Sequence, residues 1–177
     1  PWRKSNDAYS IWISEIMLQQ TQVKTVIPYY NKWMNSFPNV EEISKSTLTK
    51  VLKNWEGLGY YKRAENIYKT SQILSRNNFI IPISYKELLK LPGIGDYTAS
   101  AILSIAYNKK YASIDGNLKR VLTRLFKISK NKQTIKSFKN YANKLLCVKQ
   151  YGDINQALMD LGREICLPLK PNCIKCP

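Results

Sequence analysis

Residues 88–107 read LLKLPGIGDYTASAILSIAY, in which two apolar stretches of helical periodicity are joined by a short turn. Pro92, Gly93 and Gly95 mark that turn, because proline and glycine interrupt helices. The glycines allow backbone N–H groups to face outward at the start of the second helix, where these donors and the helix dipole favour a phosphate group. A turn of this kind can equally be structural. The stretch predicts a helical hairpin and makes its turn a candidate phosphate site.

Helical periodicity continues on both sides of the hairpin. Apolar residues follow it at Leu48, Val51, Leu52 and Trp55, at Leu118, Val121, Leu122 and Leu125, and at Ile154, Ala157, Leu158, Leu161 and Ile165. We therefore expect an all-α protein of about ten short helices. The strand-like run at residues 79–83 contains a proline and is predicted to be a loop. The polar stretch at residues 127–136, KISKNKQTIK, is predicted to be another.

Two helix starts carry local signals. Ser84 and Glu87 have the spacing of a capping box. Asp153, directly after Gly152, is placed to cap a helix as well. We expect a helix to begin immediately after Ser84 and another immediately after Asp153.

The chain is strongly basic, with 28 Lys and Arg against 12 Asp and Glu and a formal net charge of +16 over 177 residues. Such a field suits a polyanion, so nucleic acid is a candidate partner. A basic membrane-surface protein and a merely solvated basic surface are the alternatives. No apolar run approaches the roughly 20 residues of a bilayer helix, and no segment resembles a signal peptide, so we expect a soluble, intracellular protein. The chain begins at Pro1 and ends just after two cysteines, and we expect it to be trimmed at both ends.

The available chemistry is limited, because the sequence contains no histidine. Catalytic triads, the zinc-protease helix and imidazole as a base or ligand are excluded. Cys166, Cys173 and Cys176 lie in the last twelve residues, separated by six and then two residues. This spacing indicates thiolate ligation of a metal or an iron–sulfur cluster rather than a disulfide framework. Such sites take four ligands. Cys147 lies off the main apolar stripe of its own helix, and we do not expect it to be the fourth ligand.

One carboxylate stands on an apolar helix face. Glu15 lies in the segment SIWISEIMLQQTQV at residues 10–23, where a helical turn brings Ile11, Trp12 and Leu18 to its side. Burial disfavours the charged form of a carboxyl group, which is what a general acid at neutral pH requires. From this segment alone, an ion pair with a Lys or Arg of another helix is favoured over that role.

Two further segments have a structural and a functional interpretation each. Asp115 directly precedes Gly116 and a predicted helix, so on the residues alone an N-cap carboxylate is favoured. In GLGYYKRA, residues 57–64, Tyr60 and Tyr61 combine an aromatic wedge with the phosphate-pairing charge of Lys62 and Arg63. Enzymes that flip a base need such a wedge. A tyrosine in a turn is equally often a packing anchor.

Several of these segments together resemble one known family. PWR, SEIMLQQTQV, GLGYYKRA, LPGIGDYTA, IDGNLKRV and LMDLGREIC, followed by two more cysteines, resemble the MutY-type adenine DNA glycosylases in order and wording from Pro1 to Cys176. The LPGIG turn is similar to the helix-hairpin-helix DNA-binding motif. The resemblance implies two helical lobes: a six-helix bundle over residues 8–111 that ends in the hairpin, and an iron–sulfur cluster lobe formed by residues 1–7 and 112–177. From the resemblance we also expect that residues 1–177 do not include the 8-oxoguanine-reading C-terminal domain of full-length relatives.

The resemblance also implies an activity. A base-excision repair enzyme of this kind is a hydrolase that cleaves the N-glycosidic bond of adenine opposite 8-oxoguanine or guanine in duplex DNA, acts as a monomer, and in a bacterium works in the cytoplasm at the nucleoid. Tyr97 stands where bifunctional lyases have their Schiff-base lysine, so no lyase activity is expected. The rival interpretations are a thymine glycosylase acting on T·G mispairs and a non-catalytic helix-hairpin-helix DNA-binding module.

The family's roles fall on named positions of this sequence. Glu15 matches the acid that protonates adenine, Asp115 matches the carboxylate that stabilises the oxocarbenium-like sugar, Tyr97 is expected between them, and Asn117 matches a polar partner of that aspartate. The expected DNA contacts are Arg3, Gln20, Tyr60, Gly93 and Gly95. Of these, Gln20 and Tyr60 match residues that insert into the duplex near the estranged base. The expected cofactor is a 4Fe–4S cluster with Cys166, Cys173 and Cys176 as ligands and a fourth cysteine six positions after Cys176, outside this chain.

Overall fold

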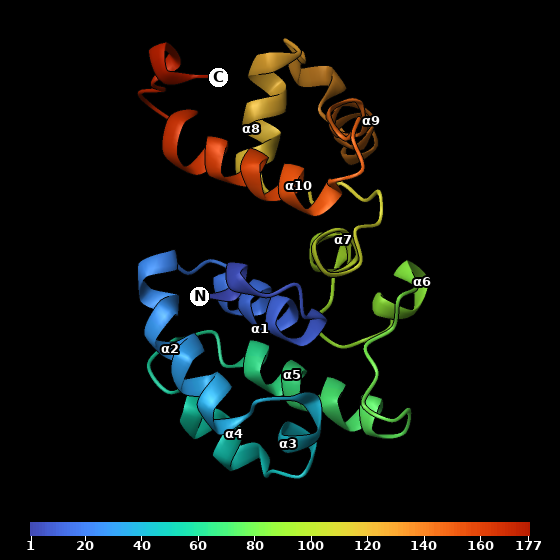
Figure 1. Ribbon diagram of the computed structural model, residues 1–177. Coiled ribbons are helices and arrows are strands. Elements are labelled where there is room, and N and C mark those ends of the chain that lie inside the picture. Colours follow the sequence, from blue (N-terminus) through green and yellow to red (C-terminus); the bar gives the residue numbers. More distant parts are fainter. The chain divides into compact units, whose positions relative to one another are not determined.

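The computed structural model describes residues 1–177, and all of its regular structure is helical (Figure 1). This confirms the predicted all-α class. The α-helices are α1 (Ala8–Leu18), α2 (Val23–Ser36), α3 (Val40–Ser44), α4 (Leu48–Trp55), α5 (Lys62–Ser75), α6 (Tyr85–Leu88), α7 (Asp96–Ala101), α8 (Gly116–Leu125), α9 (Ile135–Leu145) and α10 (Tyr151–Asp160). Single turns of 3₁₀ or π-helix are η1 (Trp2–Lys4), η2 (Ile102–Ala106), η3 (Lys130–Lys132), η4 (Leu161–Ile165) and η5 (Cys173–Lys175). None of the helices has the length and apolar composition that a membrane crossing needs.

The chain divides into two compact units, Pro1–Ile102 and Leu103–Pro177. In this division residues 1–7 belong to the first unit. The sequence-based lobes, with a boundary after residue 111 and residues 1–7 in the second lobe, stay a prediction.

The first unit is built around α1. Every residue of this helix from Tyr9 to Met17 is buried, and α1 packs against α2, α5 and α7. Trp33 of α2 and Trp55 of α4 are completely buried, with their rings edge to face at 5.5 Å. Aromatic pairs in this arrangement add stability beyond the apolar area they bury. A side chain on α1 is therefore held in a rigid, water-poor surrounding.

The hairpin turn between α6 and α7 rests on α5. Gly93 has a φ of +79°, which glycine adopts without strain. A Cβ atom there would come within 2.8 Å of the Asn66 side chain. Thr70 Oγ1 donates a hydrogen bond to the carbonyl oxygen of Pro92 over 3.0 Å. The turn that the sequence predicted is thus fixed by two residues of a helix that precedes it in the chain.

Helix starts agree only in part with the local signals. Helix α6 begins after Ser84 as predicted, but the Ser84 side chain makes no capping hydrogen bond. Helix α10 begins at Tyr151, so the prediction that Asp153 caps it is wrong, and Asp153 lies in the first turn. The reason is a tertiary cap: Asn108 Oδ1 accepts a hydrogen bond from the Tyr151 N–H over 2.8 Å.

The second unit packs α8, α9 and α10 around an apolar cluster. Leu118 and Leu122 of α8 meet Phe138 and Ala142 of α9, all four buried. The predicted loop at residues 79–83 is confirmed, since these residues form no helix or strand. The predicted loop at residues 127–136 is confirmed up to Thr134, apart from the single turn η3, because α9 begins at Ile135.

Candidate active site

Glu15 projects from the middle of the buried helix α1. Only 6% of its surface is exposed, and it is the one acidic residue among the buried polar side chains. Asp7 is the N-cap of this helix, and its side chain accepts a hydrogen bond from the Ser10 N–H over 2.8 Å. This cap fixes where α1 begins. The burial that the apolar pattern of this segment predicted for Glu15 is confirmed.

Tyr97 reaches this carboxylate from the first turn of α7. Its hydroxyl donates a hydrogen bond to Glu15 Oε2 over 2.7 Å, although 82 positions separate the two residues. The phenol follows the hairpin turn by two residues, so the turn's geometry sets where the hydroxyl lies. The structure thus brings together the two residues predicted to share one site in the first unit.

Asp115 occupies the N-cap of α8 in the second unit. Its Oδ1 accepts from the Leu118 N–H over 2.6 Å, and its Oδ2 accepts from Asn117 Nδ2 over 2.9 Å. Both carboxylate oxygens are therefore held by the first turn of the helix. Asp115 is half-buried, so it keeps a face open to a ligand. The N-cap interpretation is confirmed.

Asn117 links Asp115 to an arginine that sequence reasoning missed. Its Oδ1 accepts from Arg120 Nη2 over 2.9 Å, and Arg120 also donates to the carbonyl oxygens of Gly162, over 2.6 Å, and Cys166, over 2.8 Å. A Cβ atom at Gly162 would approach Asn117 Cβ to 2.8 Å, so the glycine allows the close contact. The i, i+3 spacing of Asn117 and Arg120 on one helix was the available sequence signal.

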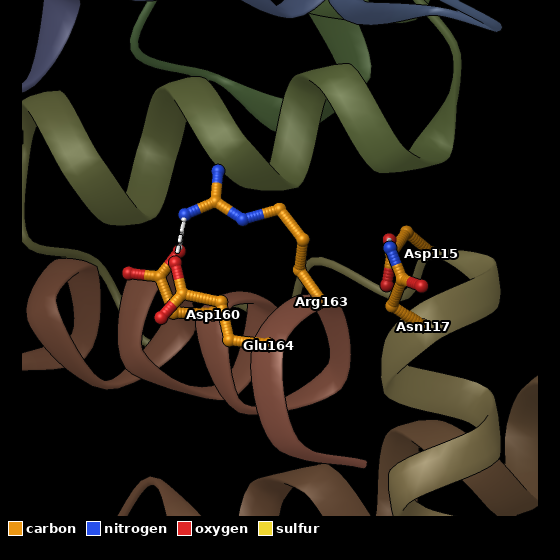
Figure 2. A network of polar contacts seen from close by, with 5 residues as sticks. All are labelled: Asp115, Asn117, Asp160, Arg163 and Glu164. Carbon is orange, nitrogen blue, oxygen red and sulfur yellow. Dashed lines mark hydrogen bonds and ion pairs between the residues drawn. The ribbon is translucent and has the colours of Figure 1, made fainter. Parts of the chain in front are cut away.

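The acidic residues near this network pair within their own segment. Arg163 Nη2 contacts Asp160 Oδ1 at 3.0 Å and Glu164 Oε1 at 2.7 Å. Figure 2 shows the Arg163 guanidinium turned toward these two acids and away from Asp115 and Asn117. The hydrogen-bond partners of Asp115 thus come from α8 itself.

The predicted wedge residues lie at the surface of the first unit. Gln20 and Tyr60 are both exposed, Tyr60 at 60%. Arg63, expected to pair with phosphate, is instead 7% exposed, because its guanidinium turns inward to backbone carbonyl oxygens. Burial lowers the pKa of Arg63, but a guanidinium titrates so high that it stays charged. Of the two cations in this segment, only Lys62 is exposed.

The other predicted DNA contacts are placed as follows. Arg3 lies in η1 and is exposed. Gly95 is the N-cap of α7, with open space where a Cβ would stand. Gly93 forms the turn described above. The role of these residues in binding DNA stays a prediction.

The three cysteines predicted to be cluster ligands, Cys166, Cys173 and Cys176, do not lie together in the structure. Cys173 and Cys176 are exposed, Cys166 is half-buried, all are free thiols, and no three potential ligands come together as a metal-holding group. Arg124 Nη1 lies 3.2 Å from Cys166 Sγ and donates to the Leu167 carbonyl oxygen over 2.8 Å. The donor set suits an iron–sulfur cluster by type, whereas the arrangement does not form its site.

Comparisons with known proteins agree with the fold and with the hairpin. The family model described as HhH-GPD superfamily base excision DNA repair protein matches residues 13–146. An adenine DNA glycosylase of Buchnera aphidicola subsp. Baizongia pistaciae is 50% identical over 179 residues, covering 100% of this chain and 51% of that protein. The chain spans about half the length of the curated Buchnera relatives it matches.

Two solved structures are similar over almost the whole chain. A thermostable thymine-DNA glycosylase superposes with a TM-score of 0.88 at 31% identity, covering 99% of this chain and 83% of that one. A trapped covalent complex of endonuclease III with DNA superposes with a TM-score of 0.84 at 22% identity, covering 97% and 81%. The second likeness concerns the fold alone.

Proposed function

Because the chain belongs to the HhH-GPD superfamily of base excision DNA repair proteins, we propose that it cleaves the N-glycosidic bond of adenine mispaired with 8-oxoguanine or guanine. The products are free adenine and an intact abasic strand. The chain acts as a monomer on duplex DNA, and its net charge of +16 supports that partner.

The observation that carries this proposal is the hydrogen bond from Tyr97 to Glu15. A carboxyl group that is 6% exposed in the middle of a buried helix is placed to act as a general acid that gives a proton to a leaving base. The phenol orients that carboxyl group through its 2.7 Å contact. Since a phenol forms no imine with a sugar, the reaction is hydrolysis without a lyase step.

Asp115 supplies the second half of the chemistry. Departure of a protonated base leaves positive charge on the deoxyribose, and a nearby carboxylate lowers the energy of that charge. The bonds from Leu118 N–H and Asn117 Nδ2 hold the Asp115 carboxylate in one orientation. Glycoside hydrolysis divides its labour between two carboxyl groups in the same way.

Two relatives point to different bases. The Buchnera protein at 50% identity is named an adenine DNA glycosylase, and the solved structure at 31% identity is a thymine-DNA glycosylase. The higher identity supports adenine. Single-turnover reactions with A·8-oxoguanine and T·G duplexes test the choice, because adenine release from the first and no thymine release from the second is the expected pattern. Thymine release alone would favour the rival enzyme, and binding without any release would favour a DNA-binding module.

We further propose that Cys166, Cys173 and Cys176 ligate a 4Fe–4S cluster. Their spacing and the thiolate preference of iron support this assignment. Arg120 and Arg124 hold the backbone at residues 166–168, which would anchor one end of a cluster-binding segment to α8. The three thiols are not gathered in the structure, so no step of the reaction is assigned to the cluster.

A further inference from the structure

Arg63 lies in the first turn of α5. Its buried guanidinium contacts two turns, the one that follows α1 and the one that precedes α5. Nη1 donates to three carbonyl oxygens at the end of α1, and Nη2 donates to two in the turn before α5. The acceptors are Ile16 at 3.1 Å, Met17 at 2.7 Å and Gln19 at 2.6 Å, and Leu58 at 3.3 Å and Gly59 at 3.2 Å. One side chain therefore ties together two segments that lie 39 to 43 positions apart in the sequence.

Each of the two segments ends in an exposed residue with strained backbone. Gln20 follows the carbonyl of Gln19 and has a φ of 56°, and Tyr60 follows the carbonyl of Gly59 and has a φ of 50°. Residues other than glycine rarely adopt this left-handed backbone conformation. It persists only where the surrounding structure enforces it. At both positions the preceding carbonyl oxygen accepts a hydrogen bond from Arg63. The guanidinium thus acts directly on the peptides that set both conformations.

Aromatic rings complete the contact. The Arg63 guanidinium carbon lies 5.2 Å from the Trp55 ring centroid and 5.3 Å from that of Tyr60. Trp55 is completely buried, and its Nε1 donates to the same Gly59 carbonyl oxygen over 2.9 Å. Tyr60 is therefore held from its inner side while most of its surface remains free. The two terminal nitrogens of a planar guanidinium point in fixed directions and can donate to both turns at once, whereas a lysine ammonium is a point charge with three donors.

We propose that Arg63 is a positioning residue that fixes Gln20 and Tyr60 as one preformed wedge for insertion into the DNA stack beside the mispair. The inference rests on the proposed function, which supplies the mispaired duplex. Groups that are already ordered before binding do not lose conformational freedom when they insert. Arg63 is buried and contacts no surface ligand, so its effect passes through the two residues it holds.

The test compares Arg63→Lys with Arg76→Lys, the same change at an exposed arginine after the end of α5. Affinity is measured for a fully paired duplex and for an A·8-oxoguanine duplex with an uncleavable 2′-fluoro adenosine, and 2-aminopurine beside the mispair reports unstacking. We expect Arg63→Lys to keep its affinity for paired duplex, to lose about tenfold in its preference for the mispair and to lose the 2-aminopurine signal. Arg76→Lys should match the wild type in all three.

A double-mutant comparison separates positioning from general structural support. If Arg63 acts through the wedge, Arg63→Lys should add little to the loss already caused by Tyr60→Ala. Full additivity of the two losses would overturn the proposal. So would a folded Arg63→Lys protein with wild-type mispair preference.

Backbone order parameters in the free wild type decide the question without any variant. We expect values near the rigid limit of about 0.85 at Gln20 and Tyr60, whereas values below about 0.6 would overturn the proposal. This measurement stands if Arg63→Lys fails to fold. It also stands if the wild type shows no preference for the mispair. That result would contradict the proposed function, and the backbone order parameters at Gln20 and Tyr60 would then be the observation that tests the proposal on Arg63.

Discussion

The Tyr97 hydroxyl donates a hydrogen bond to Glu15 Oε2 over 2.7 Å and so joins the residue after the hairpin turn to the buried carboxylate of α1. The position of Tyr97 thereby becomes part of the chemistry of Glu15. A substitution at this position can redirect the reaction if the new side chain carries a nucleophile.

Tyr97→Lys is expected to gain a lyase step. A lysine amine in this place can attack the anomeric carbon of the sugar and displace adenine, and opening of the sugar ring then gives a Schiff base. Borohydride reduces this imine to a stable protein–DNA adduct. The measurement is a denaturing gel of borohydride-treated reactions. The wild type and Tyr97→Phe should give no adduct and should leave the abasic strand intact. A folded Tyr97→Lys protein without adduct would show that this position does not face the sugar.

Asp115→Asn separates the charge of this residue from its capping role. Asparagine caps a helix about as well as aspartate, so the free energy of unfolding should change by less than about 1 kcal/mol. The rate of base release should fall at least about a hundredfold, because the charge opposite the sugar cation is lost. Asp7→Asn makes the same change at the N-cap of α1 and serves as the control. Equal rates per folded molecule for both variants would leave Asp115 as a helix cap alone.

Much of the first-unit site could be predicted from local sequence. Apolar neighbours one turn away predicted the burial of Glu15, and the turn of Pro92, Gly93 and Gly95 predicted the helix start that carries Tyr97. These features depend on periodicity within about ten residues, which a single sequence displays directly.

The features that could not be predicted depend on contacts distant in sequence. Arg63 was expected to pair with phosphate because it stands in a glycine turn beside Tyr61 and Lys62. Three of its five acceptors instead lie 44 to 47 positions earlier, at the C-terminal end of α1. Asp153 carried the local signal of a cap, but Asn108 fixes the start of α10 from 43 positions away. In both cases a side chain from another segment satisfies backbone groups that local patterns cannot assign.

Cys173→Ala tests the proposed cluster by colour. If Cys173 is a ligand, its removal should abolish or weaken the broad visible absorption of an iron–sulfur protein, because thiolates hold the irons. Cys147→Ala, at an exposed thiol just after α9, is the matched control and should leave the spectrum unchanged. An unchanged spectrum in Cys173→Ala would remove this residue from the ligand set.

Binding of undamaged duplex should weaken steeply with salt. Lysine and arginine side chains displace condensed counterions, and each neutralised phosphate contributes about 0.9 to the slope of log K against log salt. Fluorescence anisotropy of a labelled paired duplex over a series of salt concentrations measures the slope. A nearly flat dependence would contradict a DNA-binding role for the net charge of +16.

Single-turnover release of adenine by Glu15→Gln from an A·8-oxoguanine duplex tests the central claim most directly. The amide keeps the shape of the side chain and can still accept a hydrogen bond from Tyr97, but it has no acid proton to give to the leaving base. We predict near-normal duplex binding and a rate at least about a hundredfold below that of the wild type, while Glu87→Gln, at an exposed carboxylate in the first turn of α6, keeps the wild-type rate. Adenine release by folded Glu15→Gln at a rate close to that of the wild type would contradict the assignment of Glu15 as the general acid.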